Sequence, residues 1–255
     1  MTVKAAPIWV IKPSDRHMIS GSAVTFDCQT SGYPQPVIRW KFIRQINPLV
    51  SESSEPVSIL SSPQIHVLEN GSLSIRAVDL QNQGLYICDA SNGVGRPLET
   101  SGKLFVHSVP EIRVDQKQIL LRKSSQTQLH CTGLGSTPLT LQWLKNGVPL
   151  NTIDRYIVRE EFKSSEKVSN IVINNAVRND TAIFTCLAIN LFGSQSQDVD
   201  VVVQEPPDPP NGLRPIEVSA RAVTLTWSLG YTGNSPVLKH SIQYKKKSGI
   251  HQFFR

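Results

Sequence analysis

The sequence predicts an all-β protein whose first 205 residues form two tandem sandwiches, each closed by one disulfide. Two repeated units carry this prediction: Cys28, Trp40 and Cys88, then Cys131, Trp143 and Cys186. In both units the tryptophan follows twelve residues after the first cysteine, and the second cysteine completes a loop of similar length. This is the spacing of an immunoglobulin-like sandwich, because a cysteine on strand B bridges to strand F and a tryptophan on strand C packs on the bridge.

The cysteines also indicate a compartment. Four cysteines allow three disulfide pairings, and the repeated spacing favours Cys28–Cys88 and Cys131–Cys186. Such bridges persist in oxidising surroundings. The alternative is that the cysteines are reduced core residues, as in intracellular muscle-type modules. Two N-x-Ser/Thr sequons, at Asn70 and Asn179, favour the extracellular interpretation and predict glycans at both asparagines.

The first sandwich is expected over residues 7–107. Strand B is Ala23–Cys28 and strand C is Val37–Phe42, each with alternate residues turned inward. Tyr86 lies two residues before Cys88, which is the spacing of a tyrosine corner. We therefore expect Trp40 and Tyr86 in the core of this sandwich.

Two connections of the first sandwich also have sequence signals. Gln45–Ser62 is rich in Ser, Pro and Glu and predicts an irregular, exposed and mobile segment. Asn70-Gly71 predicts a two-residue hairpin between the short runs Ile65–Leu68 and Leu73–Ile75.

The second sandwich is expected over residues 108–205 with the same pattern. Trp143 takes the core position on strand C, and Phe184 takes the position of the corner tyrosine without its hydroxyl. Arg155 and Asp180 are placed to form an ion pair at the bottom of this sandwich. The matching positions of the first sandwich, Gln64 and Asn82, would form a neutral amide pair.

The last segment, residues 206–255, predicts an incomplete third domain. It follows a stiff junction with four prolines between Glu205 and Pro210. Trp227 on an alternating strand without cysteines, followed by Tyr244-Lys245, resembles the start of a fibronectin type III domain and is an expected core residue. About 50 residues are roughly half of the 90–100 that such a sandwich needs.

The ends of the chain predict a portion of a longer protein. Met1 is followed by no apolar stretch of the kind that an export signal contains. No run reaches the roughly 20 apolar residues of a membrane helix. Disulfide-closed domains without a signal or an anchor are therefore expected to be a fragment, an incomplete gene product or an expressed portion of a longer protein.

Several phrases resemble the Dscam family of immunoglobulin-superfamily cell adhesion molecules. Arg155-Tyr-Ile-Val-Arg-Glu-Glu161, followed by Asp180-Thr-Ala-Ile-Phe-Thr-Cys186-Leu-Ala-Ile-Asn190-Leu-Phe-Gly193, looks like the ninth immunoglobulin domain of arthropod Dscam. Gly84-Leu-Tyr-Ile-Cys88-Asp-Ala-Ser-Asn-Gly-Val-Gly95 is similar to the end of the eighth. Gly233-Asn-Ser-Pro236 is similar to the first fibronectin domain that follows. In the shortened Dscams of chelicerates the same run would be the second and third immunoglobulin domains.

The resemblance implies two I-set immunoglobulin-like domains in a single-pass surface receptor that recognises copies of itself, as in neuronal wiring, axon guidance and dendrite self-avoidance. The distal variable domain of the family is absent here. The two sandwiches would accordingly act as spacers or as secondary contacts. The implied location is the extracellular side of the plasma membrane.

Other function classes have little support in the sequence. The six histidines are scattered without partners at catalytic or metal-ligand spacing, so neither an enzyme nor a metal site is predicted, and no cofactor is implied. A net charge of +6 is only mildly basic and does not indicate nucleic acid binding. The ectodomain of a receptor tyrosine kinase or phosphatase, and a secreted immunoglobulin-type immune recognition protein, remain alternatives. Which surface binds, and to what, is not encoded in any motif.

Overall fold

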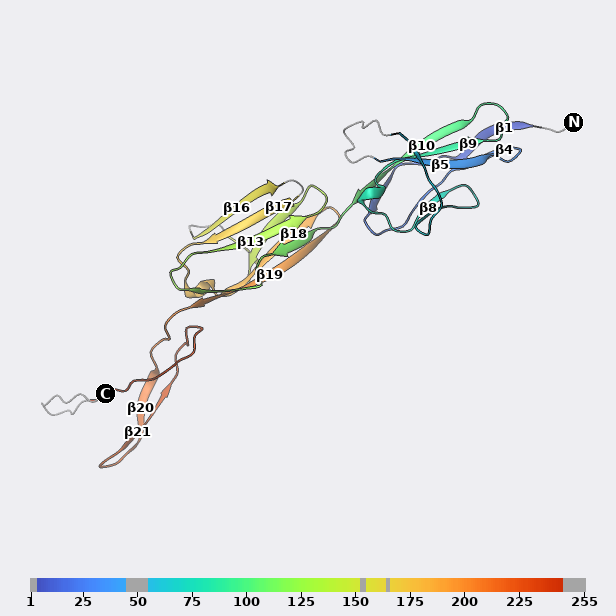
Figure 1. Ribbon diagram of the computed structural model, residues 1–255. Coiled ribbons are helices and arrows are strands. Elements are labelled where there is room, and N and C mark those ends of the chain that lie inside the picture. Colours follow the sequence, from blue (N-terminus) through green and yellow to red (C-terminus); the bar gives the residue numbers. More distant parts are fainter. Residues whose placement is uncertain (1–3, 45–54, 152–154, 164–165, 245–255) are drawn as a thin grey trace. The chain divides into compact units, whose positions relative to one another are not determined.

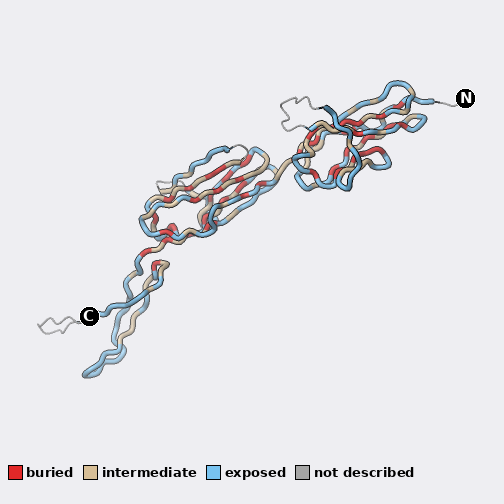
Figure 2. Tube along the Cα trace, in the orientation of Figure 1, coloured by how far each residue is buried: buried red, intermediate tan, exposed pale blue. Residues whose placement is uncertain are grey.

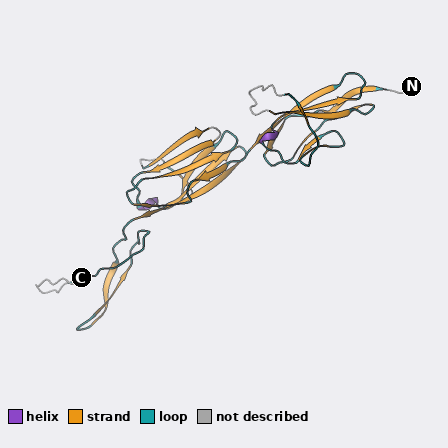
Figure 3. Cartoon of the chain, in the orientation of Figure 1, coloured by secondary structure: helices purple, strands orange, loops and turns teal. Residues whose placement is uncertain are grey.

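Regular structure in this chain is almost entirely strand (Figure 3). The computed structural model describes residues 4–44, 55–151, 155–163 and 166–244. In these ranges the helical elements are two single turns, η1 (Leu80–Asn82) and η2 (Arg178–Asp180). No helix within them has the length and apolar composition to cross a membrane. Residues 45–54 of the expected irregular connection lie outside the described residues.

The first sandwich is built from short, mostly antiparallel strands around one core (Figure 1). One sheet has the order β3 (Val24–Phe26), β8 (Leu73–Ile75) and β7 (Ile65–Val67). The other has the order β2 (Arg16–Ile19), β10 (Leu98–His107), β9 (Gly84–Ser91), β5 (Val37–Arg44) and β6 (Val57–Ser58), with β2 parallel to β10. A separate pair joins β1 (Ala5–Ile11) to β4 (Gln29–Tyr33).

Alternation along the strands produces the core of this sandwich. Val24 and Phe26 on β3 are buried, while Thr25 between them is exposed. On β5 Trp40 points inward and is only 2% exposed, and Ile38 and Phe42 pack against the same core. Successive side chains of a strand point to opposite faces, so one face of each sheet is buried and the other meets solvent. Figure 2 shows buried residues alternating with exposed ones along the strands of both sandwiches.

The loop between β7 and β8 differs from the two-residue hairpin expected at Asn70-Gly71. Val67 pairs with Leu73, and the Leu68 amide donates to the Ser72 carbonyl at 2.8 Å. The Gly71 amide donates to the Leu68 carbonyl at 2.9 Å, and Gly71 has φ +89°. This is a three-residue loop in which glycine takes the left-handed position after a tight turn. The pair Asn70-Gly71 correctly indicated a turn. The loop is one residue longer than expected because the hydrogen bond from Leu68 to Ser72 closes it.

The second sandwich repeats the arrangement with longer strands (Figure 1). One sheet has the order β11 (Glu111–Val114), β13 (Thr127–Leu134), β17 (Glu166–Ile173) and β16 (Tyr156–Lys163). The other has the order β12 (Gln118–Arg122), β19 (Gly193–Gln204), β18 (Ala182–Asn190), β14 (Thr140–Lys145) and β15 (Val148–Pro149). The alternating valines of β19 are buried at Val199, Val201 and Val203.

The segment after the second sandwich contains one antiparallel pair, β20 (Asn211–Val218) and β21 (Val223–Ser228). Trp227, expected in a core, is only partly buried. Every residue of β20 is exposed, so within the described residues no second sheet covers this pair. A two-stranded sheet alone gives a tryptophan only one side to pack against, and such a pair is at best marginally stable in water.

Gly71→Ala is expected to destabilise the first sandwich more than Gly21→Ala does. Both glycines have a left-handed φ, +89° and +88°. A Cβ at Gly71 would lie 2.2 Å from Ile38 Cδ1 and 2.8 Å from the Cys28 carbonyl oxygen, whereas one at Gly21 meets nothing within 4 Å. Each variant should lose about 1 kcal/mol for the backbone conformation, and Gly71→Ala a further 1–3 kcal/mol, roughly, for overpacking. Denaturant unfolding of both variants measures the difference, and equal losses would contradict the packing explanation.

Candidate functional site

The centre of the first sandwich is a disulfide packed against a tryptophan. Cys28 and Cys88 are bonded with their Cα atoms 6.7 Å apart, and both are fully buried. Trp40 is paired in register with Cys88, and its Nε1 donates to the Gly71 carbonyl at 2.9 Å. The Tyr86 hydroxyl donates to the Asn82 carbonyl at 2.8 Å, which is the expected tyrosine corner. The bridge, the indole and the corner therefore fix β5, β9 and the β7–β8 loop together.

The second sandwich has the same centre with different closing contacts. Cys131 and Cys186 are bonded with their Cα atoms 6.5 Å apart. Trp143 Nε1 donates to the Ser169 hydroxyl, at 3.1 Å, instead of to a backbone carbonyl. Phe184 is fully buried in the position of Tyr86 and has no hydroxyl to donate. Both disulfide pairings favoured by the sequence are confirmed.

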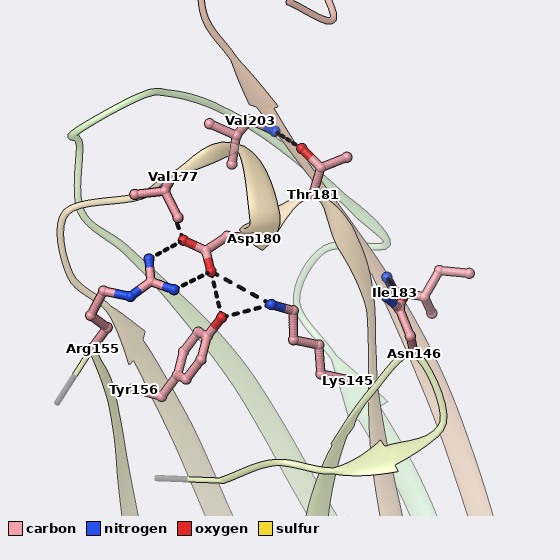
Figure 4. Close-up of polar contacts among 9 residues, drawn as sticks. All are labelled: Lys145, Asn146, Arg155, Tyr156, Val177, Asp180, Thr181, Ile183 and Val203. Carbon is pink, nitrogen blue, oxygen red and sulfur yellow. Dashed lines mark hydrogen bonds and ion pairs between the residues drawn. The ribbon is translucent and has the colours of Figure 1, made fainter. Parts of the chain in front are cut away.

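A charged network occupies the bottom of the second sandwich (Figure 4). Asp180, fully buried in η2, accepts a fork of two hydrogen bonds from Arg155, at 2.9 and 3.2 Å. The Val177 amide donates to the same carboxylate at 2.9 Å. The Tyr156 hydroxyl donates to Asp180 as well, and Lys145 Nζ donates to that hydroxyl at 2.9 Å. The expected Arg155–Asp180 ion pair is thus present, with two partners that sequence reasoning missed.

The network sets the ionisation of its members. Burial alone would raise the pKa of Asp180, but hydrogen bonds from Tyr156, the Val177 amide and Arg155 hold that pKa below its ordinary value. Burial, followed by the hydrogen bond to Asp180, raises the pKa of Tyr156. Burial lowers the pKa of Lys145, and the charge of Arg155 adds to that effect. The carboxylate is accordingly held ionised because its hydrogen bonds replace the water it has lost.

The first sandwich closes its bottom without such a network. Asp79 caps η1 by accepting from the Gln81 amide at 2.8 Å, and Asn82 accepts from the Asp79 amide at 2.8 Å. The Asn82 side chain is therefore used in a capping box. Within the described residues no hydrogen bond joins it to Gln64, so the expected amide pair does not form.

A second charged cluster lies where the chain leaves the second sandwich. The buried Glu205 carboxylate is paired with Lys123 at 2.8 Å and with Arg178. Arg178 also donates a fork to Asp208, at 2.7 and 3.0 Å, and its guanidinium lies 4.1 Å from the centre of the Tyr231 ring. Sequence reasoning missed this cluster, although a glutamate beginning a proline-rich junction and an acidic residue three positions later were a signal for it.

The outer face of the β10–β9–β5 sheet is the candidate binding surface of the first sandwich. Because Trp40 points inward, its neighbours Arg39 and Lys41 point outward. Arg39 pairs in register with Asp89, which pairs with Glu99 on β10, so the three side chains form one row across the sheet. Lys41 forms an ion pair with Asp89. Around this row the β5 side of the face is basic and the β9–β10 side is acidic, and Lys103 points outward from β10 farther along the strand.

Both predicted glycosylation sites lie at the surface. Asn70 is exposed in the β7–β8 loop, where its Oδ1 accepts from the Ser72 amide at 3.0 Å. Asn179 is exposed in η2, between Arg178 and the buried Asp180. Within the described residues no group of three or more His, Cys, Asp or Glu side chains is placed to hold a metal ion.

Comparison with known proteins agrees with the two sandwiches. The immunoglobulin domain family matches residues 6–92 and 109–190. The chain is 32% identical over 248 residues to the cell adhesion molecule Dscam1 of Drosophila melanogaster, with 96% of this chain covered. It is 34% identical over 249 residues to the cell adhesion molecule DSCAM of Homo sapiens, with 97% covered. The chain spans 12% of the length of either relative.

Solved structures share the fold. The N-terminal four immunoglobulin domains of Dscam1 isoform 7.44 superpose with a TM-score of 0.56 at 17% identity, covering 80% of this chain and 47% of that one. The insect immune protein hemolin gives 0.59 at 20% identity, covering 80% and 48%. Domains A168–A170 of titin give 0.53 at 21% identity, covering 91% and 78%. At these identities the likeness concerns the fold alone.

Asp180→Asn is expected to lower the free energy of unfolding of the second sandwich by about 3 kcal/mol at pH 7, because it leaves Arg155 without its buried partner. The pKa of Asp180 is depressed in the folded state, so its contribution is complete above the ordinary value of 3.8 and is lost as the pH falls through the folded value. The difference between the two proteins should therefore shrink below pH 3.8.

Asp115→Asn is the matched control, because Asp115 is an exposed aspartate of the same sandwich. It should change stability by less than about 0.5 kcal/mol. Denaturant unfolding at pH 7 and at pH 3 measures both variants. If Asp180→Asn were as stable as the control at pH 7, the network would have no structural role.

Proposed function

The chain belongs to the immunoglobulin domain family, and we propose that it is part of the ectodomain of a Dscam-like cell adhesion receptor that binds copies of itself at cell contacts. The observation that carries the proposal is similarity to cell adhesion molecules of flies and vertebrates over 96–97% of the chain. Similarity over two sandwiches and the segment that follows them is more specific than a match to a single immunoglobulin domain.

The geometry supports recognition by surfaces. Each sandwich uses its interior for a disulfide and a tryptophan, and the buried charges of the second sandwich are paired with one another. Binding would therefore use the outer sheet faces and the loops, where side chains can vary without cost to the core. Proteins are the proposed partners, and no enzymatic step, cofactor or nucleic acid enters the proposal.

The domain organisation proposed from the sequence accompanies this function. Residues 7–107 and 108–205 would be the two immunoglobulin-like domains, of the I-set type, and residues 206–255 would be part of a fibronectin type III domain. The exposed alternating strands β20 and β21 are consistent with half of such a sandwich. The proposed location is the extracellular side of the plasma membrane, with the chain as one portion of a single-pass receptor.

Glycans are predicted at Asn70 and Asn179 when the chain is made in a secretory pathway. Both asparagines are exposed in turns, so a glycan would not disturb the core. Glycosidase treatment should lower the mass of the secreted chain, and Asn70→Gln together with Asn179→Gln should abolish that shift. Occupancy at Asn179 should be incomplete, because aspartate holds the middle position of its sequon. A secreted chain whose mass does not change would remove this support for an extracellular location.

Bead clustering tests the adhesive function directly. Two fluorescent bead populations carrying the 255-residue chain should form mixed clusters, because dense display makes weak contacts detectable. In solution the chain should be monomeric or only weakly self-associated, consistent with spacers or secondary contacts. Beads that carry a longer ectodomain, including a distal domain, should cluster more strongly. Failure of both bead types to cluster would contradict homophilic binding.

A further inference from the structure

The outer face of the first sandwich has a charge pattern that complements itself. Along one row, Arg39 on β5 lies on one side of Asp89, and Glu99 on β10 lies on the other. Arg39 and Glu99 are both exposed. The pKa of Lys41 is raised by its hydrogen bond to Asp89, then by the charges of Asp89 and Glu99. In this row the acidic side chains therefore lie on β9 and β10 and the basic one lies on β5, while Lys103 points outward from β10 beside Leu85.

The middle of the same face is apolar. Leu85 and Ile87 point outward from β9, because their neighbours Tyr86 and Cys88 are buried in the core. Lys41 and Ser101 flank Ile87 in register and cover most of it, so that Ile87 is only 9% exposed, while Leu85 is partly buried. An apolar centre between polar flanks is the usual anatomy of a protein interface.

Symmetry decides which partner fits this pattern. In an isologous dimer both copies use the same patch, so a twofold axis parallel to β9 sets β5 of one copy against β10 of the other. Because Arg39 and Glu99 occupy one row, Arg39 of each copy then faces Glu99 of its mate. Leu85 and Ile87 meet their own counterparts on the axis. Asp89 also meets its counterpart, but each Asp89 is already neutralised by Lys41 of its own copy.

We propose that the outer face of β10, β9 and β5 is a self-association surface for a second copy of this chain, with reciprocal Arg39–Glu99 ion pairs flanking an apolar centre. The inference rests on the proposed homophilic function and names its surface. Three strands about 4.8 Å apart, with about eight residues each, present roughly 400 Å² per copy. That area falls at the weak end of specific interfaces, which suits a secondary contact that adhesion makes multivalent.

Charge reversal distinguishes this arrangement from other modes of self-association. Arg39→Glu places two acidic residues opposite each other in the dimer, and Glu99→Arg places two basic residues opposite each other. Each variant alone should self-associate at least about tenfold more weakly than wild type, because like charges are brought into contact. A one-to-one mixture of the two variants restores both ion pairs, and its hetero-association should approach that of wild type.

The experiment uses the complete 255-residue chain in sedimentation equilibrium and in bead clustering. Arg76→Glu and Glu69→Arg are the matched controls, because both residues are exposed and lie beside the other sheet, Arg76 just after β8 and Glu69 in the β7–β8 loop. They should associate as wild type does, singly and mixed. Thermal unfolding of every variant checks that the sandwiches remain folded. Association of the wild type should also weaken as salt is raised, because the flanking ion pairs are solvent-accessible.

The outcomes separate the surface from the function. Wild-type clustering that both reversals leave unchanged would overturn the surface and leave homophilic binding intact. If the single variants are folded and lose association, but their mixture does not regain it, the twofold pairing is overturned. A third outcome is that wild-type beads fail to cluster while variants of this face lose binding to a different receptor. That result would assign the face to another protein and overturn self-association. The proposal is supported only when each single variant loses self-association and the one-to-one mixture regains it.

Discussion

A buried disulfide packed against one tryptophan is the constraint on which each sandwich depends. It ties the two sheets at their middle and places the indole of Trp40 or Trp143 against the bridge. Closing loops of 60 and 55 residues restricts the unfolded chain by about 4 kcal/mol each on the chain-entropy account. Because this centre is internal, the outer faces can change without loss of the fold. A chain built this way is suited to recognition by surfaces, and its two sandwiches can carry different surfaces.

The two sandwiches share their centre and differ in how they close. In the first, Tyr86 donates to the backbone of η1, and Asp79 with Asn82 caps that turn. In the second, Phe184 cannot donate, and the bottom is held by Asp180 with Arg155 and Tyr156. Breaking a buried ion pair costs more than removing a capping group. The second sandwich therefore depends on charge in a way that the first does not.

The sequence predicted the parts of this molecule that follow from fixed spacing. The disulfides, the alternating core strands and the Arg155–Asp180 pair all have positions set by the repeat. The length of the loop at Gly71 was not predictable, because it depends on the hydrogen bond from Leu68 to Ser72. Lys145 and Tyr156 were missed because strand packing alone brings them to Asp180. The row Arg39–Asp89–Glu99 was missed for the same reason, since register joins residues sixty positions apart.

Disulfide mapping of the secreted chain tests the two-sandwich account most directly. The chain would be alkylated without reduction, digested, and its linked peptides identified by mass spectrometry. We expect one link between Cys28 and Cys88, another between Cys131 and Cys186, and no alkylated cysteine. A link between a cysteine of the first unit and one of the second would contradict two independent sandwiches. Four alkylated cysteines in the folded chain would contradict the central role of the bridges.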